Sequence, residues 1–265
     1  MHLVPVDDPH DPRLVELTRL TDAAARARIE AEHGCFVAEG ILTLEAVLGS
    51  RHPLRAVLVA EPKLPRVAAL LDDVDVDVFV APPALLEGVT GYPIHRGVIA
   101  SVGRLPLPDP AALLAGARRV LVIDAVNDHE NLGSLFRNAA AFAVDAVLLD
   151  PRCADPLYRR SVRVSLGHVL RVPWTRIGPL PGSLALLRDA GLRTLALTPS
   201  GERTAAQVDP SERLAWLVGA EGPGLDDAVL AVADERIRIP IAAGVDSLNV
   251  ATAAAVAFAL SSTLR

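Results

Sequence analysis

The chain has 265 residues, which exceeds one average domain and predicts two. Apolar residues make up 51 % of it and charged residues 22 %, a balance that supports well-filled cores and excludes a disordered protein. The net charge of −6 argues against indiscriminate binding of polyanions, so nucleic acid would have to be bound through local basic patches.

Aromatic residues make up only 3 %, which argues against recognition of bases by stacking on a broad aromatic platform. Cys35 and Cys153 are the only cysteines, and they have neither a disulfide pattern nor a metal-ligand spacing. The N-terminus lacks the basic region and apolar segment of a secretory signal. No run approaches the roughly 18 apolar residues of a membrane span. We therefore expect a cytoplasmic protein with no metal site and no membrane partner.

The first hundred residues are predicted to form a helical lead-in followed by a small α/β domain. Residues 1 to about 34 form the lead-in, where Asp22 caps a helix over Ala23 to Ala31. Short apolar runs then alternate with helical patterns as far as Gly103, with strands expected at Leu54–Val59 and Val74–Val80.

A proline-studded stretch, Leu105 to Pro110, has the composition of a semi-rigid linker. The domain boundary is expected there. Residues 1–104 then form the first domain, residues 105–118 the linker and the start of the second domain, and residues 119–265 the rest of the second domain.

Beyond the linker, strand and helix patterns alternate regularly. Apolar strand runs are expected at Val120–Asp124, Ala146–Leu149, Leu192–Leu197, Leu214–Val218 and Arg236–Ile239. The main helices are expected at Leu132–Phe142, Ser183–Ala190, Leu225–Ala233 and Asn249–Leu264. Such an alternation indicates an α/β fold with a parallel sheet covered on both faces. Ligands of these sheets bind beyond the carboxyl ends of the strands.

Three polar turns follow strands in this half of the chain. In the first turn, Asn131 stands at a helix-cap position and Gly133 allows another backbone to approach closely. Arg137 lies nearly two turns further along the same helix, among apolar residues. Two interpretations of Arg137 stay open: a surface arginine whose stem lies along the helix, or an arginine at a pocket edge that grips phosphate or polarises a hydroxyl.

The second turn, Gly219-Ala220-Glu221-Gly222-Pro223-Gly224, contains three glycines and one carboxylate. It has neither the lysine of a Walker phosphate loop nor the spacing of a dinucleotide-binding turn. Its glutamate suits a ligand with a cationic or hydroxyl-rich part, or else is a solvated side chain in a glycine-rich connection.

The third turn runs from Ile239-Pro240-Ile241 to Asp246 and then to Ser247-Leu248-Asn249-Val250-Ala251, where an apolar helix opens. Ser247 and Asn249 place a hydroxyl and an amide beside main-chain groups that the helix leaves unpaired. Each is also an ordinary helix-capping residue. Three polar turns at strand ends predict one composite pocket.

Between the first and second turns lies an arginine-rich segment. Its arginines are Arg152, Arg159, Arg160, Arg163, Arg171 and Arg176, and its main opposing charges are Asp150 and Asp155. Either it is a solvated face with intrachain ion pairs, or it contacts phosphate groups through the bidentate donors of arginine.

The three turns together resemble the motifs of the SpoU (TrmH-like) RNA ribose 2'-O-methyltransferases of the SPOUT class. The first motif is carried by Asp128, Asn131, Leu132, Gly133 and Arg137, and the second and third turns resemble the other two motifs in order and spacing. The resemblance covers the chain from about residue 119 to the end. His129 and Glu130 depart from it, since many members carry proline and a small residue there.

Weaker likeness extends to other segments. Phe36-Val37-Ala38-Glu39-Gly40 and His95-Arg96-Gly97-Val98 are similar to landmarks of a ribosomal-protein-like substrate-binding domain that precedes many such enzymes. The segments Cys153–Pro156 and Arg163–Gly167 are similar to the stretch that follows the first motif.

The resemblance implies a C-terminal SPOUT domain with a parallel sheet and a deep trefoil knot, which ordinary topology rules would not predict. It also implies a smaller N-terminal α/β domain that binds the RNA substrate. S-adenosylmethionine would be the cofactor, bound by Gly219, Glu221, Gly222, Ile239, Ile241, Ser247, Leu248 and Asn249. The catalytic residues would be Arg137, Asn131, Glu221, Ser247 and Asn249.

The expected function is 2'-O-methylation of a ribose in RNA, with ribosomal RNA favoured over transfer RNA, by a homodimer formed through the C-terminal domain. The alternative is a catalytically inactive SPOUT-fold protein that binds RNA. A nucleotide-dependent oxidoreductase is disfavoured because the glycine fingerprint is absent, and a hydrolase because no G-x-S-x-G elbow occurs.

Overall fold

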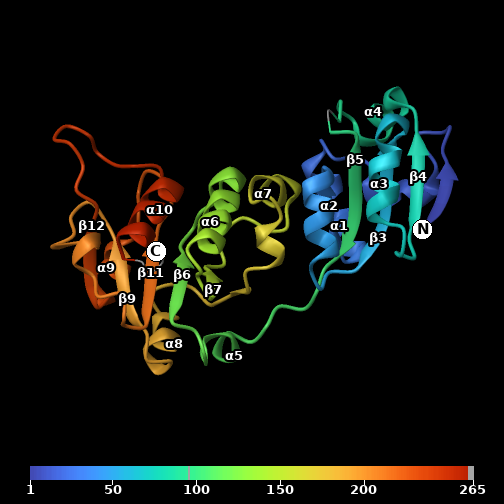
Figure 1. Cartoon of the computed structure of the whole chain (residues 1–265). Helices are drawn as coiled ribbons and strands as arrows, with labels where there is room; N and C mark the ends of the chain where they lie inside the picture. The colour runs from blue at the N-terminus through green and yellow to red at the C-terminus, as the bar shows by residue number, and fades with distance from the viewer. Residues whose placement is uncertain (95, 262–265) are drawn as a thin grey trace. The chain divides into compact units, whose positions relative to one another are not determined.

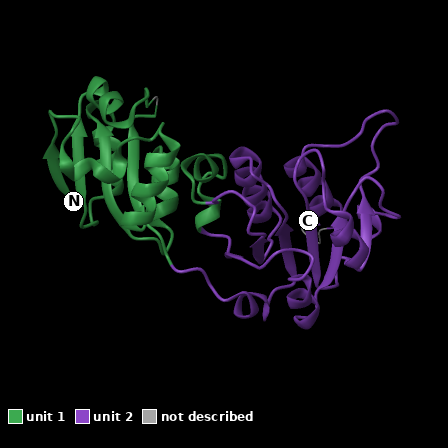
Figure 2. Cartoon of the chain, turned by 180° about the vertical axis from the view of Figure 1, so that it is seen from behind, with its two compact units in different colours: residues 1–105, 157–170 green, residues 106–156, 171–265 purple. Residues whose placement is uncertain are grey.

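The computed structural model describes residues 1–94 and 96–261, and the chain divides into two compact units. Unit 1 comprises Met1–Leu105 together with Leu157–Leu170, and unit 2 comprises Pro106–Pro156 and the chain from Arg171 onwards (Figure 2). The chain therefore leaves unit 1 within the proline-studded stretch and returns to it once. Nothing in the sequence pattern predicted that return.

Unit 1 is built on a five-stranded sheet with the order β1-β4-β3-β5-β2. Its strands are β1 (His2–Pro5), β2 (Cys35–Glu39), β3 (Leu54–Ala60), β4 (Asp77–Ala81) and β5 (Val98–Gly103). Strands β1, β4 and β3 are parallel, whereas β5 runs antiparallel to both β3 and β2. One apolar core lies on this sheet and includes Val37 of β2, Leu58 of β3, Phe79 of β4 and Ile99 of β5.

The helices of unit 1 are α1 (Ala23–His33), α2 (Ile41–Leu48), α3 (Leu64–Leu70), α4 (Pro83–Thr90) and α7 (Arg159–Val164), with short 3-10 turns η1 (Pro12–Leu17), η2 (Glu61–Lys63) and η3 (His168–Leu170). The predicted cap of α1 is confirmed, since the Asp22 carboxylate accepts a hydrogen bond from Ala25 N–H over 3.0 Å. The helical lead-in was wrong at its start. His2–Pro5 is a strand because its backbone pairs with the free edge of β4.

Unit 2 is built on a seven-stranded sheet in which every strand pair is parallel, with the order β10-β12-β9-β11-β6-β7-β8. Its strands are β6 (Arg119–Ile123), β7 (Ala146–Leu149), β8 (Trp174–Arg176), β9 (Arg193–Leu197), β10 (Arg203–Thr204), β11 (Leu214–Val218) and β12 (Glu235–Arg238). The predicted parallel sheet and its five strands are confirmed. The strands β8 and β10 were not predicted, because strands of three and two residues are too short to form a recognisable apolar run.

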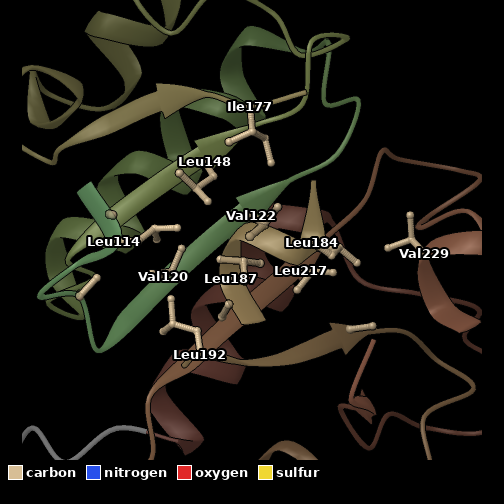
Figure 3. Packing of buried hydrophobic residues seen from close by; sticks show 14 of the residues in the cluster. Leu114, Val120, Val122, Leu148, Ile177, Leu184, Leu187, Leu192, Leu217 and Val229 are labelled. Carbon is tan, nitrogen blue, oxygen red and sulfur yellow. The ribbon is translucent and has the colours of Figure 1, made fainter. Parts of the chain in front are cut away.

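Helices cover both faces of this sheet: α5 (Pro110–Leu114), α6 (His129–Ala141), α8 (Leu184–Asp189), α9 (Asp227–Val232) and α10 (Val250–Leu260), with a 3-10 turn η4 (Ala205–Gln207). Figure 3 shows one face, where strand residues such as Val122 and Leu217 pack with Leu114, Leu187 and Val229 of α5, α8 and α9. Alternation along the strands sends the next side chains to the other face.

The second face is covered by α6 and α10. The rings of Trp216 and Phe258 lie 6.5 Å apart, and those of Phe136 and Trp174 lie 6.3 Å apart. The helix predicted over Asn249–Leu264 is present as α10, but residues 262–264 lie outside the described part of the chain. No helix among the described residues has both the length and the apolar character needed to cross a bilayer.

Candidate active site

The loops that carry the first two motifs begin side by side. Strands β6 and β11 are neighbours, and Ile123 at the end of one lies opposite Val218 at the end of the other. Strand β12 is separated from β11 by β9, so its own loop has to run back to reach the same place. Figure 1 shows this long connection between β12 and α10, which spans residues 239–249.

The first loop is capped by Asp128, not by Asn131 as the sequence suggested. The Asp128 carboxylate accepts hydrogen bonds from Glu130 N–H and Asn131 N–H over 2.9 and 2.8 Å. The helix α6 therefore begins at His129, three residues earlier than predicted, because a carboxylate was available ahead of the asparagine. This leaves the Asn131 side chain, inside the first turn and half-buried, free to bond elsewhere.

The second loop closes tightly on itself. Ala220 and Gly224 form an isolated antiparallel bridge, in which Gly224 N–H donates to the Ala220 carbonyl over 3.0 Å. A Cβ on Gly219 would lie 2.2 Å from the carbonyl carbon of Gly224, which no side chain permits. Gly222 and Gly224 have φ values of +87° and +72°. This geometry presents Glu221 at the exposed tip of the loop.

The third loop ends at Asn249, whose side chain uses both of its polar atoms. Its Oδ1 accepts hydrogen bonds from Ala251 N–H and Thr252 N–H and so caps α10. Its Nδ2 donates over 2.7 Å to Asn131 Oδ1 and also over 2.7 Å to Glu221 Oε1. Because Nδ2 carries two hydrogens, each acceptor receives one. One amide therefore joins the three motif loops.

A second asparagine on α6, Asn138, was missed. Its Nδ2 donates to the Ala251 carbonyl of α10 over 2.7 Å. Asn131 and Asn138 are seven residues apart, which places them on one face of a helix. The spacing of the two asparagines could be seen in the sequence, but the Ala251 carbonyl could not be identified from it as the partner of Asn138. The two asparagines together fasten α6 to the start of α10.

Arg137 and Ser247 do not join this cluster. Arg137 is exposed on α6, and within the described chain its guanidinium has no hydrogen bond or ion pair. Ser247 is exposed in the third loop, and its hydroxyl likewise bonds to no described residue. Both side chains are therefore available to a ligand.

The third loop presents both apolar side chains and unpaired main-chain groups. Ile241, Val245 and Leu248 are 36 %, 51 % and 37 % exposed, whereas Ile239 is half-buried. Of the backbone N–H groups in residues 241–249, only that of Val245 finds a backbone acceptor among the described residues, at Ala242. Apolar side chains next to unpaired backbone N–H groups suit a ligand that has both apolar and polar parts.

Two buried carboxylates lie at the strand ends next to the first loop. Asp124 and Asp150 are buried at the ends of β6 and β7, and both accept hydrogen bonds from Arg152. Burial raises the pKa of the Asp124 carboxyl, an effect that Arg152 partly opposes. Arg176 donates to the carbonyls of Cys153 and Ala154.

The arginine-rich segment is thus largely occupied within the chain. Besides Arg152 and Arg176, Arg159 and Arg163 pair with Glu39 inside unit 1. These contacts favour intrachain ion pairs for Arg152, Arg159 and Arg163, and hydrogen bonds to main-chain carbonyls for Arg176, over a free phosphate-contacting face. A cavity of about 180 Å³ lies at the amino end of β12 and is lined by residues that include Glu202, Leu230 and Asp234, whereas the third motif loop follows the carboxyl end of that strand. The joined motif loops, and not this cavity, carry the polar side chains of the three motifs.

The chain is similar to known proteins in sequence. The sequence profile of the SpoU rRNA Methylase family matches residues 118–259. A protein of Mycobacterium tuberculosis called an uncharacterized tRNA/rRNA methyltransferase is 46 % identical over 257 residues, which cover 96 % of this chain and 89 % of that protein.

Solved structures share the fold. One is an rRNA methyltransferase from Sinorhizobium meliloti with AdoMet bound, with a TM-score of 0.82, 23 % identity and coverage of 98 % of this chain and 97 % of the other. Another is an RNA 2'-O ribose methyltransferase with a TM-score of 0.79, 24 % identity and coverage of 97 % and 98 %. The family match, the extent of the Mycobacterium similarity and the three joined motif loops lead to one conclusion: the chain belongs to the SpoU rRNA methylase family.

Proposed function

We propose that the protein transfers a methyl group from S-adenosylmethionine to the 2'-hydroxyl of a ribose in RNA, with ribosomal RNA as the preferred substrate over transfer RNA. The observation that carries this proposal is the meeting of Asn131, Glu221 and Asn249 through one amide, because it assembles the three family motifs at a single place. The similarity to a tRNA/rRNA methyltransferase and to an RNA 2'-O ribose methyltransferase supports the same reaction class.

The residues of the second and third loops fit the cofactor. Gly222 leaves backbone uncovered, and Gly219 lets the second loop fold closely onto Gly224, while Ile241 and Leu248 offer apolar surface for an adenine ring beside the unpaired N–H groups of the third loop. The proposed cofactor site also includes Ile239, Ser247 and Asn249. Glu221 supplies a carboxylate for a hydroxyl-bearing or cationic part of the ligand. When bound, S-adenosylmethionine supplies a sulfonium methyl group that is open to in-line attack by an oxygen nucleophile.

The chain itself has to position the ribose and draw away the proton of its 2'-hydroxyl. Orientation of reactants can supply up to roughly 7–11 kcal/mol of a reaction barrier. Arg137 is suited to ease the second task, in which the proton passes to solvent water, because a guanidinium only donates hydrogen bonds. Its free guanidinium grips the adjacent phosphate bidentately and lowers the pKa of the hydroxyl electrostatically. Asn131 and Asn249 hold the loops in register, and Ser247 shapes the pocket.

Three further parts of the proposal come from family likeness. Residues 119–265 would contain the trefoil knot, residues 1–104 would select the RNA, and two chains would pair through the C-terminal domain in a two-fold homodimer. These parts, and a cytoplasmic location, stay predictions. Sedimentation of the active protein tests the pairing: an active monomer would contradict it.

The test of the reaction is transfer of labelled methyl groups to unmodified ribosomal RNA and, separately, to unmodified transfer RNA. The Arg137→Ala variant is measured beside the wild type, with cofactor binding followed by calorimetry. Label in one RNA, lost in the variant while the cofactor still binds, supports both the reaction and the role of Arg137. Absence of cofactor binding in the wild type would instead support the catalytically inactive RNA-binding alternative.

A further inference from the structure

Two glycines at one end of the unit 1 sheet have cationic side chains lying on them. Gly40 follows β2 and Gly97 precedes β5, and because these strands are antiparallel the two glycines lie at the same end of the sheet. Gly40 N–H donates to the Val98 carbonyl over 2.9 Å, and Ala60 N–H at the end of β3 donates to the Gly97 carbonyl over 2.8 Å. Three strand ends are thus bonded together here.

The missing Cβ atoms make room for the cations. A Cβ on Gly40 would lie 2.8 Å from Cδ of Arg96, and a Cβ on Gly97 would lie 3.0 Å from Cγ of Lys63. Both glycines have positive φ values, +96° and +64°, so other residues are strained there. The stems of Arg96 and Lys63 therefore lie flat on backbone, which leaves their charged ends at the surface.

Neither cation is bonded to the part of the chain that the structure describes. Arg96 and Lys63 are both exposed, and neither has a hydrogen bond or ion pair with a described residue. Lys63 is also the only lysine in the sequence. His95, next to Arg96 and part of the expected landmark, lies outside the described residues. Glu61, two residues from Lys63, is an exposed acid near this end.

The other carboxylate at this end, Glu39, is already neutralised. It is 4 % exposed and accepts from Tyr92 Oη over 2.9 Å, with Arg159 Nη1 at 3.5 Å and Arg163 Nη1 at 3.4 Å. Two guanidiniums face one carboxylate, so the cluster keeps a net positive charge. Glu39 therefore does not oppose an anion at Arg96.

We propose that this end of the unit 1 sheet, formed by Gly40, Arg96, Gly97 and Lys63, is a surface that contacts the phosphate backbone of the substrate RNA. Cations whose stems are supported by backbone lose less side-chain freedom when they bind, which suits repeated contact with phosphate oxygens. The low aromatic content fits recognition by shape and phosphate over base stacking. The inference deepens the proposed function and depends on it.

The experiment uses the full chain with unmodified ribosomal RNA and unmodified transfer RNA as probes. Arg96→Gln, Lys63→Gln and the double variant are compared with Arg51→Gln. Arg51 is also exposed and lies at the opposite end of the same sheet, ahead of β3. RNA affinity is measured over a range of salt concentrations, and kcat, KM for RNA and cofactor affinity are measured at one concentration.

The double variant is expected to weaken RNA binding and raise KM about tenfold, and to reduce the slope of log affinity against log salt by about one to two. Its kcat and cofactor affinity should stay at the wild-type values, and Arg51→Gln should change nothing. Wild-type KM and salt slope in the double variant, while methyl transfer proceeds, would overturn this surface and leave the proposed function intact. Failure of the wild type to bind either RNA would overturn both.

Discussion

Asn249 Nδ2 donates a hydrogen bond to Glu221 Oε1 over 2.7 Å, and the same nitrogen donates to Asn131 Oδ1 over 2.7 Å. The Oδ1 atom of that amide is already committed to the first turn of α10. Turning the amide over would place an oxygen against two oxygens and a nitrogen against two N–H groups. The cap of α10 therefore orients the donor that joins the loops.

The Asn249→Ser variant separates the cap from the link. Serine caps helices about as well as asparagine, so the free energy of unfolding should change by less than about 0.5 kcal/mol. Its single hydroxyl cannot serve both Asn131 and Glu221, and methyl transfer should fall about tenfold or more because a hydrogen bond to a charged group is lost. Thermal unfolding and transfer assays measure the two effects. Asn249→Ala should add a further loss of about 1 kcal/mol in stability. Full transfer by the serine variant would refute the link.

Gly219→Ala should disrupt the second loop. The added methyl would lie 2.2 Å from the backbone of Gly224, so the bridge between Ala220 and Gly224 has to open. We expect cofactor affinity to fall at least tenfold, as measured by calorimetry. Gly116→Ala is the matched control, because nothing lies within 4 Å of the added atom and its φ is not positive. Equal behaviour of the two variants would contradict this account.

Glu39→Gln should loosen the segment Leu157–Leu170 from unit 1. Arg159 and Arg163, whose side chains are 14 % and 31 % exposed, would lose their charged partner, at a cost of about 2 kcal/mol. Hydrogen exchange of that segment should become roughly thirtyfold faster. Glu45→Gln is the control, since its ion pair with Arg66 is long, at 3.6 Å, and exposed, and should contribute less than about 0.5 kcal/mol. Unchanged exchange in Glu39→Gln would show that the contact is not what holds the segment.

Both thiols should be unreactive in the folded protein. Burial raises the pKa of Cys153 to about 11 and raises the pKa of Cys35 as well. The thiolate is the reactive form, so a raised pKa lowers its share at pH 8, to roughly one part in a thousand for Cys153. A disulfide reagent should therefore titrate no thiol at pH 8 until denaturant is added, and two thiols afterwards. One rapidly reacting equivalent in the native protein would be inconsistent with this burial.

Much of unit 2 could be predicted from the sequence. The apolar runs of β6, β7, β9, β11 and β12 are long enough to identify, and the helices between them make the sheet parallel. The three glycines of the second turn were visible in the sequence, and the close approach of Gly224 to Gly219 requires the residue at 219 to have no side chain. Local composition determines these features because each depends on neighbours within a few residues.

The sequence by itself therefore determined the fold class, the three motif turns and the family. Only the tertiary structure decided which motif residues meet. Asn131 does not cap α6 as predicted, because the Asp128 carboxylate binds the N–H groups of the first turn, and Asn138 could not be identified because its partner lies on α10. Leu157–Leu170 belongs to unit 1, where Arg159 and Arg163 pair with Glu39, more than a hundred residues earlier in the chain. Contacts between distant residues depend on the order of strands in the sheet, and no local pattern encodes that order.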